Sequence, residues 1–370
     1  MVNTIQQVGQ LGQSIWYDNM RRGMLRSGEL QRLIDLGVTG LTSNPTIFEK
    51  AITGSSDYDD AILEQAREGN NAGEIYEQLV IDDIRAAADL LRPTYDRTGA
   101  ADGFASLEIS PHLAHDTDGT VAEARRLFRT LDRPNVMMKV PATPEGVPAV
   151  HRLIGEGINV NVTLMFSLGA YSEVRQAYIA GLEDLDWSGE ELGRVASVAS
   201  FFVSRVDVSV ESRLEDAAER ERGDVEALLG QAAIANAKLA YREFQKDFGG
   251  ERFARLRAKG ARVQRPLWAS TSTKNPAYSD VLYADALIGP DTVDTMPDVT
   301  LEAFLDHGTA AEALSKDMGD AERFFDSLQE AGVDMDEVTA GLLSDGVKAF
   351  TDSFDSLIAN IEEKRAGLLA

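Results

Sequence analysis

The sequence predicts an α/β protein built as a (β/α)8 TIM barrel, with additional helices at the C-terminal end of the chain. Short apolar runs rich in β-branched residues alternate with longer segments of helical periodicity, which is typical of a parallel sheet whose strands are connected by helices. Eight such repeats can be counted, the number that closes a barrel. The chain has 370 residues, more than the ~250 of an ordinary barrel, so further elements are expected.

Each predicted strand is a short, mostly apolar run that ends at polar or turn residues. The strands are predicted at Ser14–Asp18, Val38–Ser43, Phe104–Ile109, Asn135–Val140, Ile158–Phe166, Val195–Val203, Pro266–Ser270 and Val281–Ala286. The segments between them carry apolar side chains at helical spacing. They predict helices at Glu74–Leu91, Thr120–Leu131, Tyr171–Leu182, Asp207–Glu221 and Val225–Phe248.

The chain beyond the eighth predicted strand carries turn signals at Gly289–Asp291 and Pro297, and then reads as several helices with acidic exposed faces. These helices are predicted at Leu301–Asp306, Ala310–Leu314, Ala321–Gln329, Asp336–Leu343 and Val347–Lys364. No linker rich in Pro, Gly or Ser separates them from the preceding repeats. We therefore expect one domain over residues 1–370, in which residues 298–370 form a helical extension packed on the barrel.

The charge of the chain argues against several classes of partner. Its 61 acidic and 36 basic side chains give a net charge of −25. A surface this acidic repels nucleic-acid phosphates and anionic lipids, so neither nucleic acid nor membrane is expected as a partner. The first residues lack the basic and apolar regions of a signal peptide, and no window approaches the ~20 apolar residues that span a bilayer. A soluble cytoplasmic enzyme is the expectation.

The composition also limits the chemistry. With no Cys in the chain, disulfides, thiolate nucleophiles and zinc–thiolate sites are excluded. The four His residues, His112, His115, His151 and His307, show no pair at the helical i, i+4 spacing of a zinc site. We expect no metal and no cysteine-based catalysis.

Three charged side chains belong to strands whose C-terminal ends should meet at one end of the barrel, where barrel enzymes carry their active sites. Asp18 closes the first predicted strand, Glu108 lies in the third and Lys139 in the fourth. Lys139 is surrounded by the apolar run Val136–Val140. It either extends to solvent at the strand end or stays inside, where burial favours the neutral amine that attacks a carbonyl carbon.

The neighbouring residues bear on that choice. Asp18 and Glu108 taken singly read as ion-pair partners, but beside a lysine they form a carboxylate pair able to move protons through water. Asn161 and Thr163 share one face of the fifth predicted strand because side chains alternate along a strand. They are either hydrogen-bonded packing residues or groups that hold substrate hydroxyls and a water molecule.

A phosphate site is suggested after the sixth and seventh predicted strands. Arg205 follows the sixth strand, and Ser272 and Lys274 follow the seventh. Loops after the late strands of a barrel commonly hold phosphate, with Arg as a two-pronged donor and Lys as a point charge. Singly, each of these residues is more often an ordinary surface group.

Five segments together resemble the transaldolase family. Gly40–Phe48 (GLTSNPTIF) is similar to the family signature after the second strand, and Val136–Ala142 (VMMKVPA) is similar to the segment that holds the family's Schiff-base lysine. Gly157–Ser167 (GINVNVTLMFS) resembles a third family block. Pro266–Pro276, followed by Ile288–Thr292, resembles the longer bacterial branch of the family. The resemblance covers the chain from about Ile15 to Pro297.

The resemblance implies a class I aldolase-type barrel without metal or organic cofactor. It implies transfer of a dihydroxyacetone unit from sedoheptulose 7-phosphate to glyceraldehyde 3-phosphate, which gives erythrose 4-phosphate and fructose 6-phosphate in the pentose phosphate pathway. By position, Lys139 corresponds to the nucleophile and Asp18 and Glu108 to the acid and base, with Glu108 and Thr163 holding a catalytic water.

The same comparison implies the substrate contacts. Asn44, Asn161 and Ser200 match residues that hold the dihydroxyacetone moiety, and Arg205 matches a phosphate-binding Arg. An Arg of the shorter family members is replaced within Ser270–Lys274, so Ser272 and Lys274 are the candidates for that half of the phosphate site. The role of the C-terminal helices and the oligomeric state stay open.

Two other functions are compatible with these residues. A sugar-phosphate aldolase similar to fructose 6-phosphate aldolase would use the same barrel and release free dihydroxyacetone. A non-catalytic sugar-phosphate-binding barrel is disfavoured, because binding alone does not need Asp18, Glu108 and Lys139 together.

Overall fold

The computed structural model describes residues 2–219 and 226–370 and contains a closed barrel of eight parallel strands in sequence order, which confirms the predicted fold class. The strands are β1 (Gln13–Tyr17), β2 (Gly40–Thr42), β3 (Ala105–Glu108), β4 (Val136–Pro141), β5 (Val160–Met165), β6 (Ser197–Phe202), β7 (Arg265–Ala269) and β8 (Thr292–Met296). The barrel closes where β8 pairs with β1, from Gln13 opposite Thr292 to Tyr17 opposite Met296.

The first seven predicted strands each overlap an observed strand, but the eighth prediction is wrong. Residues Val281–Ala286 contain the short helix α13 (Leu282–Ala286), and the eighth strand is β8. A short apolar run fits a buried helical turn as well as a strand, so periodicity could not separate the two. The sequence of β8 resembles a loop because Asp294 and Thr295 are polar, although both residues are buried.

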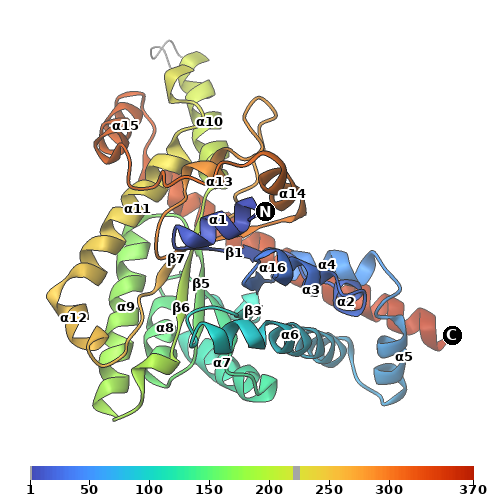
Figure 1. Ribbon diagram of the computed structural model, residues 1–370. Coiled ribbons are helices and arrows are strands. Elements are labelled where there is room, and N and C mark those ends of the chain that lie inside the picture. Colours follow the sequence, from blue (N-terminus) through green and yellow to red (C-terminus); the bar gives the residue numbers. More distant parts are fainter. Residues whose placement is uncertain (1, 220–225) are drawn as a thin grey trace.

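Helices surround the barrel, as Figure 1 shows. The helices before β5 are α1 (Thr4–Gln10), α2 (Arg22–Arg26), α3 (Glu29–Leu36), α4 (Pro45–Thr53), α5 (Asp59–Arg67), α6 (Ala72–Arg97), α7 (Thr117–Leu131) and α8 (Gly146–Gly155). Those between β5 and β8 are α9 (Leu168–Trp187), α10 (Ser204–Glu219), α11 (Ala232–Gly249), α12 (Glu251–Arg257) and α13. Short 3-10 turns lie at η1 (Pro111–Leu113), η2 (Leu192–Arg194) and η3 (Glu226–Leu228).

The predicted helices between the strands agree with this arrangement, apart from their ends. The last two residues of the predicted helix Asp207–Glu221, and Val225 at the start of the next prediction, lie outside the described residues. The helix predicted from Val225 begins only at Ala232. Among helices of the described residues, none combines the length and the hydropathy that crossing a membrane requires.

Three helices follow β8, namely α14 (Asp298–His307), α15 (Met318–Glu330) and α16 (Met335–Leu369). The helix predicted at Ala310–Leu314 is absent, because the amides of Ala313 and Leu314 donate instead to the carbonyl of Ile288, both at 3.0 Å.

The two predicted helices Asp336–Leu343 and Val347–Lys364 are one continuous helix, α16. The Ser-Asp-Gly sequence lies between the two predictions, and its glycine, Gly346, lies inside α16 where the helix approaches the barrel. A Cβ atom on Gly346 would come within 2.9 Å of the Leu164 side chain, so tertiary packing explains this glycine. In Figure 1, α16 (red) runs past α4 toward α5, where the C-terminus lies.

The interior of the barrel is packed closely enough to require a glycine on β2. The Trp16 indole lies against Gly40, where an added Cβ atom would be only 2.4 Å from the ring. The indole Nε1 donates to Asp102 Oδ1 at 2.8 Å, toward the end of the barrel where β3 begins. Gly40 therefore has a packing role inside the barrel.

A buried carboxyl on β8 is incompletely paired. Asp294 has no exposed surface. Its Oδ1 accepts a hydrogen bond of 2.9 Å from Thr271, and its Oδ2 has no partner within the described residues. Burial raises the pKa of Asp294 to about 7, well above its ordinary value of 3.8, and nearby Asp18 adds to the rise. The folded protein therefore binds a proton here that the unfolded chain has already lost between pH 4 and 7.

We predict that Asp294→Asn stabilises the protein, and more at pH 8 than at pH 5. Since the folded-state pKa is raised, the stability of the wild type falls as pH rises toward 7, and the amide removes that loss. One pKa unit corresponds to about 1.4 kcal/mol, so the gain at pH 8 is expected at ~1–4 kcal/mol. The measurement is the thermal or urea midpoint at both pH values. Asp291→Asn, at an exposed carboxyl, is the control and should show no such pH dependence. An equal gain of Asp294→Asn at pH 5 and pH 8 would contradict the argument.

Candidate active site

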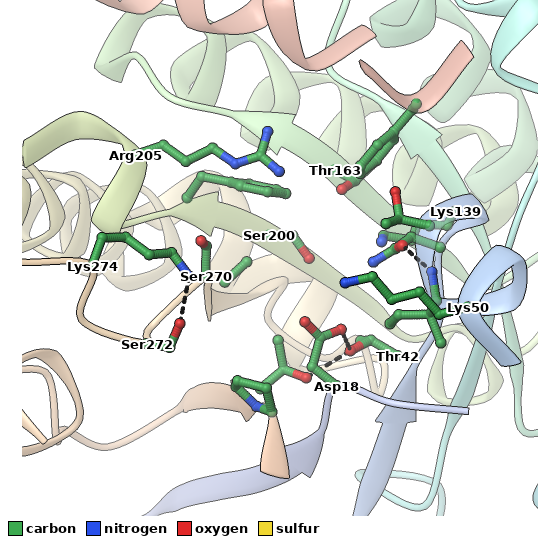
Figure 2. Close-up of a pocket in the computed structure, with 18 of the residues that line it drawn as sticks. Asp18, Thr42, Lys50, Lys139, Thr163, Ser200, Arg205, Ser270, Ser272 and Lys274 are labelled. Atoms are coloured by element: carbon green, nitrogen blue, oxygen red, sulfur yellow. Dashed lines mark hydrogen bonds between the residues drawn. The ribbon is translucent and has the colours of Figure 1, made fainter. Parts of the chain in front are cut away.

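A cavity of about 380 Å³ opens at the C-terminal end of the barrel. Eight of the ten predicted site residues line it, and these are Asp18, Asn44, Lys139, Thr163, Ser200, Arg205, Ser272 and Lys274. The other two, Glu108 and Asn161, are buried and contact residues of the cavity wall. Figure 2 shows Arg205 and Lys274 on one side of the cavity, Lys139 and Thr42 on the other, and Ser200 between them.

Lys139 lies inside the barrel rather than extending to solvent. Its side chain is held on β4, and the residue is only 4% exposed. The Nζ atom lies 3.2 Å from Glu108 Oε2 and donates a 3.1 Å hydrogen bond to the Ser43 carbonyl. The parallel register pairs Glu108 with Lys139 across β3 and β4, which brings their side chains together. The local fold therefore presents one amine, with a carboxylate beside it, to the cavity.

The two carboxylates near Lys139 are both shifted toward the protonated form. Burial raises the pKa of Glu108, and the negative charge of Asp18 adds to this while Lys139 opposes it. Burial likewise raises the pKa of Asp18, against the effects of Lys139, a hydrogen bond from Thr42, Arg205 and Lys274. The Thr42 hydroxyl donates to Asp18 Oδ1 at 2.7 Å. Such carboxyl groups can exchange protons nearer to neutral pH than ordinary ones.

Polar side chains on β5 and β6 lie next to Lys139 and Glu108 in the barrel. Asn161 is fully buried and lies opposite Lys139 in the sheet register. Its Nδ2 donates to Ser106 Oγ at 3.1 Å, and its Oδ1 accepts from Ser200 Oγ at 2.7 Å. These bonds fix the Ser200 side chain in the cavity wall.

Thr163 faces the cavity from a distorted part of β5. The pairing of β5 with β6 shifts register between Val162 and Met165, and Leu164 has a positive φ of 56°. Bulges of this kind redirect side chains and are common at barrel rims. The Thr163 hydroxyl is buried without a hydrogen-bond partner in the described part of the chain, so it is available to a water molecule or a ligand.

Asn44, at the start of α4, both caps that helix and lines the cavity. It caps the helix, its Oδ1 accepting from the Ile47 amide at 3.0 Å, and Pro45 follows at the first helical position, where a missing amide hydrogen costs nothing. Its Nδ2 makes no hydrogen bond within residues 2–219 and 226–370, which leaves two donor hydrogens at the cavity.

The cationic side of the cavity is built from the ends of β6 and β7. The Ser204 amide donates to the Ser270 carbonyl at 3.1 Å, and the two hydroxyls are 3.0 Å apart. Arg205 follows directly, with its guanidinium 5.3 Å from the centre of the Phe202 ring. Lys274 donates to Ser272 Oγ at 2.6 Å. The predicted phosphate-site residues are therefore brought together.

This cationic side has an excess of positive charge. Burial lowers the pKa of Lys274, and the positive charges of Arg205 and Lys50 lower it further, while Asp18 opposes them. Arg205 makes no hydrogen bond or ion pair to any described residue. An anionic ligand would relieve both the burial and the mutual repulsion of these cations.

Among the cavity residues that the sequence predictions missed are a cation and an aromatic ring. Lys50 on α4 lines the cavity, and its spacing from Thr46 and Ile47, four and three residues earlier, puts all three on one helix face. That spacing could have revealed Lys50. Phe350 of α16 also lines the cavity, but no local pattern indicates that the last helix reaches the barrel.

His112 and His115 follow the third predicted strand, and a structural role is the expectation for both. His112 pairs with Asp355 of α16 at 2.7 Å, and His115 pairs with Glu145 at 3.1 Å; neither lines the cavity. Within residues 2–219 and 226–370, no group of three or more His, Asp or Glu side chains could hold a metal ion.

Taken together, the cavity offers a buried amine, two carboxyl groups that titrate above their usual range, several hydroxyl and amide groups, and a cationic wall. This set suits a carbonyl compound that carries hydroxyl groups and a phosphate. An amine forms a Schiff base with the carbonyl carbon, carboxyl groups move protons, and cations hold the phosphate.

Comparison with known proteins agrees with this description. The model of the Transaldolase/Fructose-6-phosphate aldolase family matches residues 15–361. The chain is 46% identical over 364 residues to a protein of Saccharopolyspora erythraea named Transaldolase, covering 98% of both. It is 45% identical over 372 residues to the Transaldolase of Trichodesmium erythraeum, again covering 98% of both. It is 45% identical over 350 residues to the Transaldolase of Mycobacterium ulcerans, covering 94% of this chain and 93% of the relative. The chain belongs to the transaldolase/fructose-6-phosphate aldolase family.

Proposed function

We propose that this protein is a transaldolase of the pentose phosphate pathway, which moves a dihydroxyacetone unit from sedoheptulose 7-phosphate to glyceraldehyde 3-phosphate. The products are erythrose 4-phosphate and fructose 6-phosphate. The observation that carries the proposal is the buried Lys139 amine, 3.2 Å from Glu108, in a cavity that also contains Arg205 and Lys274. The near full-length relatives named Transaldolase support the same activity.

Lys139 is proposed as the nucleophile. Its Nζ attacks the ketone carbon of the donor sugar, and the resulting carbinolamine loses water to form the Schiff base. Glu108 lies beside the amine and donates and accepts the protons of these steps. A water molecule held between Glu108 and the free hydroxyl of Thr163 would carry those protons.

Asp18 is proposed as the base for carbon–carbon cleavage. It accepts the proton of the C4 hydroxyl, the C3–C4 bond breaks, and its electrons move toward the Schiff-base nitrogen. The aldehyde product leaves, and a three-carbon enamine remains on Lys139. The acceptor aldehyde then reacts with the enamine carbon, Asp18 returns the proton to the new hydroxyl, and hydrolysis frees the product and the lysine.

The remaining polar residues hold the two ends of the substrate. Asn44, Asn161 and Ser200 lie around the Lys139 end and are proposed to bind the dihydroxyacetone hydroxyls. Arg205, Ser272 and Lys274 are proposed to bind the phosphate, because Arg supplies a two-pronged donor and Lys a second charge. Lys50, a further cation that lines the cavity, is proposed to contact either the hydroxyls or the phosphate of the substrate.

The first prediction is that borohydride reduction with fructose 6-phosphate attaches a three-carbon adduct to Lys139. Reduction traps a Schiff base at the nitrogen that forms it, and peptide mass mapping identifies the residue. Lys139→Ala should give no adduct and no transfer activity. Lys50→Met removes a second lysine that lines the cavity, and the adduct on Lys139 should persist in that variant. An adduct on Lys50 or Lys274 would refute the assignment.

The second prediction concerns Asp18→Asn. Loss of the base should lower turnover by ~10²- to 10⁴-fold, while Lys139 still forms the Schiff base. Borohydride should then trap the intact six-carbon sugar phosphate rather than a three-carbon unit, which mass spectrometry distinguishes. A three-carbon adduct at the wild-type level would show that another group breaks the bond.

The third prediction concerns the pH profile of the wild type. Asp18 acts only when ionised, and its pKa is raised from 3.8. The acid limb of kcat/KM should therefore lie above the range of an ordinary Asp, with activity lost as pH falls through it. A profile flat down to pH 4 would contradict this role.

The fourth prediction tests the phosphate site. Arg205→Met or Lys274→Met should lower kcat/KM for glyceraldehyde 3-phosphate by ~10- to 100-fold, the loss expected for one charge-assisted hydrogen bond. The same variants should change kcat/KM for unphosphorylated glyceraldehyde far less. Equal losses for both acceptors would mean that these residues support the fold or the chemistry rather than the phosphate.

A further inference from the structure

One aromatic side chain from outside the barrel reaches the reactive lysine. Phe350 lies on α16, after all eight strands, yet its ring centre is 5.8 Å from Lys139 Nζ. The residue is 4% exposed and lines the cavity. A cation within about 6 Å of a ring face is attracted to it. Phe350 thus covers the amine from the side that the barrel strands leave open.

The position of Phe350 is set by contacts within two helical turns on either side. On one side, Gly346 lets α16 approach β5 so closely that a Cβ atom would come within 2.9 Å of Leu164. On the other side, the hydroxyls of Ser353 and Thr46 are 2.8 Å apart, and Ser356 donates to Glu49 at 2.5 Å. Since Thr46 and Glu49 lie on α4, the helix that also carries Asn44, Phe350 is fixed relative to the rest of the cavity.

The covalent intermediate of the proposed function has two possible fates. An acceptor aldehyde can add to the enamine carbon, which completes the transfer. Alternatively, the enamine takes up a proton at that carbon to give an iminium ion, and water adds to the iminium carbon. The carbinolamine then expels the Lys139 amine and releases dihydroxyacetone. The second fate consumes one water and turns a transferase into an aldolase.

We propose that Phe350 is a specificity-determining residue, whose ring covers the Schiff base on Lys139 from the side of α16 and slows the addition of bulk water there. The single water proposed between Glu108 and Thr163 still serves the proton transfers of the reaction. This inference rests on the proposed function. Three hydroxyl groups, those of Thr42, Thr163 and Ser200, line the same cavity as Lys139. The Phe350 ring has neither a donor nor an acceptor to hold water over the iminium carbon, and its face stabilises the positive charge of the iminium ion.

The test measures the ratio of dihydroxyacetone released to dihydroxyacetone transferred, with fructose 6-phosphate as donor and erythrose 4-phosphate as acceptor. Phe350→Ala should raise this ratio about tenfold, the change expected when a desolvated cation–π contact and its cover are lost. Phe350→Leu retains apolar cover without the ring face and should give an intermediate ratio, a partial rescue. Phe350→Leu also gives a result if Phe350→Ala does not fold.

Phe354→Ala is the matched control. Phe354 lies on the next turn of α16, packs edge-on against Tyr76 with ring centres 5.3 Å apart, and does not line the cavity. It should weaken α16 packing without raising the ratio. An unchanged ratio in both Phe350 variants, or the same rise in Phe354→Ala, would overturn the inference. Borohydride trapping on Lys139 of the wild type reports separately on the proposed function, because that result does not depend on Phe350.

Discussion

The buried ion pair between Lys139 and Glu108 is the interaction on which the rest of the site depends. Two charges inside a barrel carry a large desolvation cost, and removing either partner would leave the other buried and unpaired. The pair is tolerated because the β3–β4 register aligns the residues, the Ser43 carbonyl accepts a second hydrogen bond from the amine, and the Phe350 ring faces it. Each of these contacts comes from a different part of the chain, so the site requires the whole barrel and α16.

The net charge of −25 describes the outside of the protein and not the cavity. Arg205, Lys274 and Lys50 face the same cavity as Asp18, so the local balance there is positive. Many surface carboxylates are paired, as in the contact between Glu77 and Arg126 at 2.5 Å. At physiological salt the Debye length is about 8 Å, so distant surface charges scarcely reach the cavity. The acidic surface repels large anionic partners, whereas a small anion is attracted by the cations at the mouth of the barrel.

Sequence patterns predicted the barrel and most of the site because both follow from local rules. Alternating apolar runs mark strands, and Asp18, Lys139 and Thr163 were found because functional residues gather where parallel strands end. The strand β8 was not predicted because Asp294 and Thr295 are polar. Their burial depends on hydrogen bonds with the hydroxyls of Thr271 and Thr42, which come from other parts of the chain. The position of Phe350 depends on where α16 packs, which is a tertiary property that no window of sequence contains. Lys50 is intermediate, since its spacing on α4 was visible but its direction toward the cavity was not.

The strained backbone at Leu164 shows how catalysis and packing are connected. A residue with a side chain at positive φ costs ~1–3 kcal/mol and persists only where its surroundings compensate. Here the register shift of β5 against β6 turns Thr163 into the cavity with an unpaired hydroxyl, and Gly346 of α16 packs on the Leu164 side chain. The helix that covers Lys139 therefore also packs on the distortion that frees the Thr163 hydroxyl. The end of the chain thus contacts the candidate active site twice, once through Phe350 and once through Gly346 packed on Leu164, so α16 is part of the cavity wall and not an appendage to the barrel.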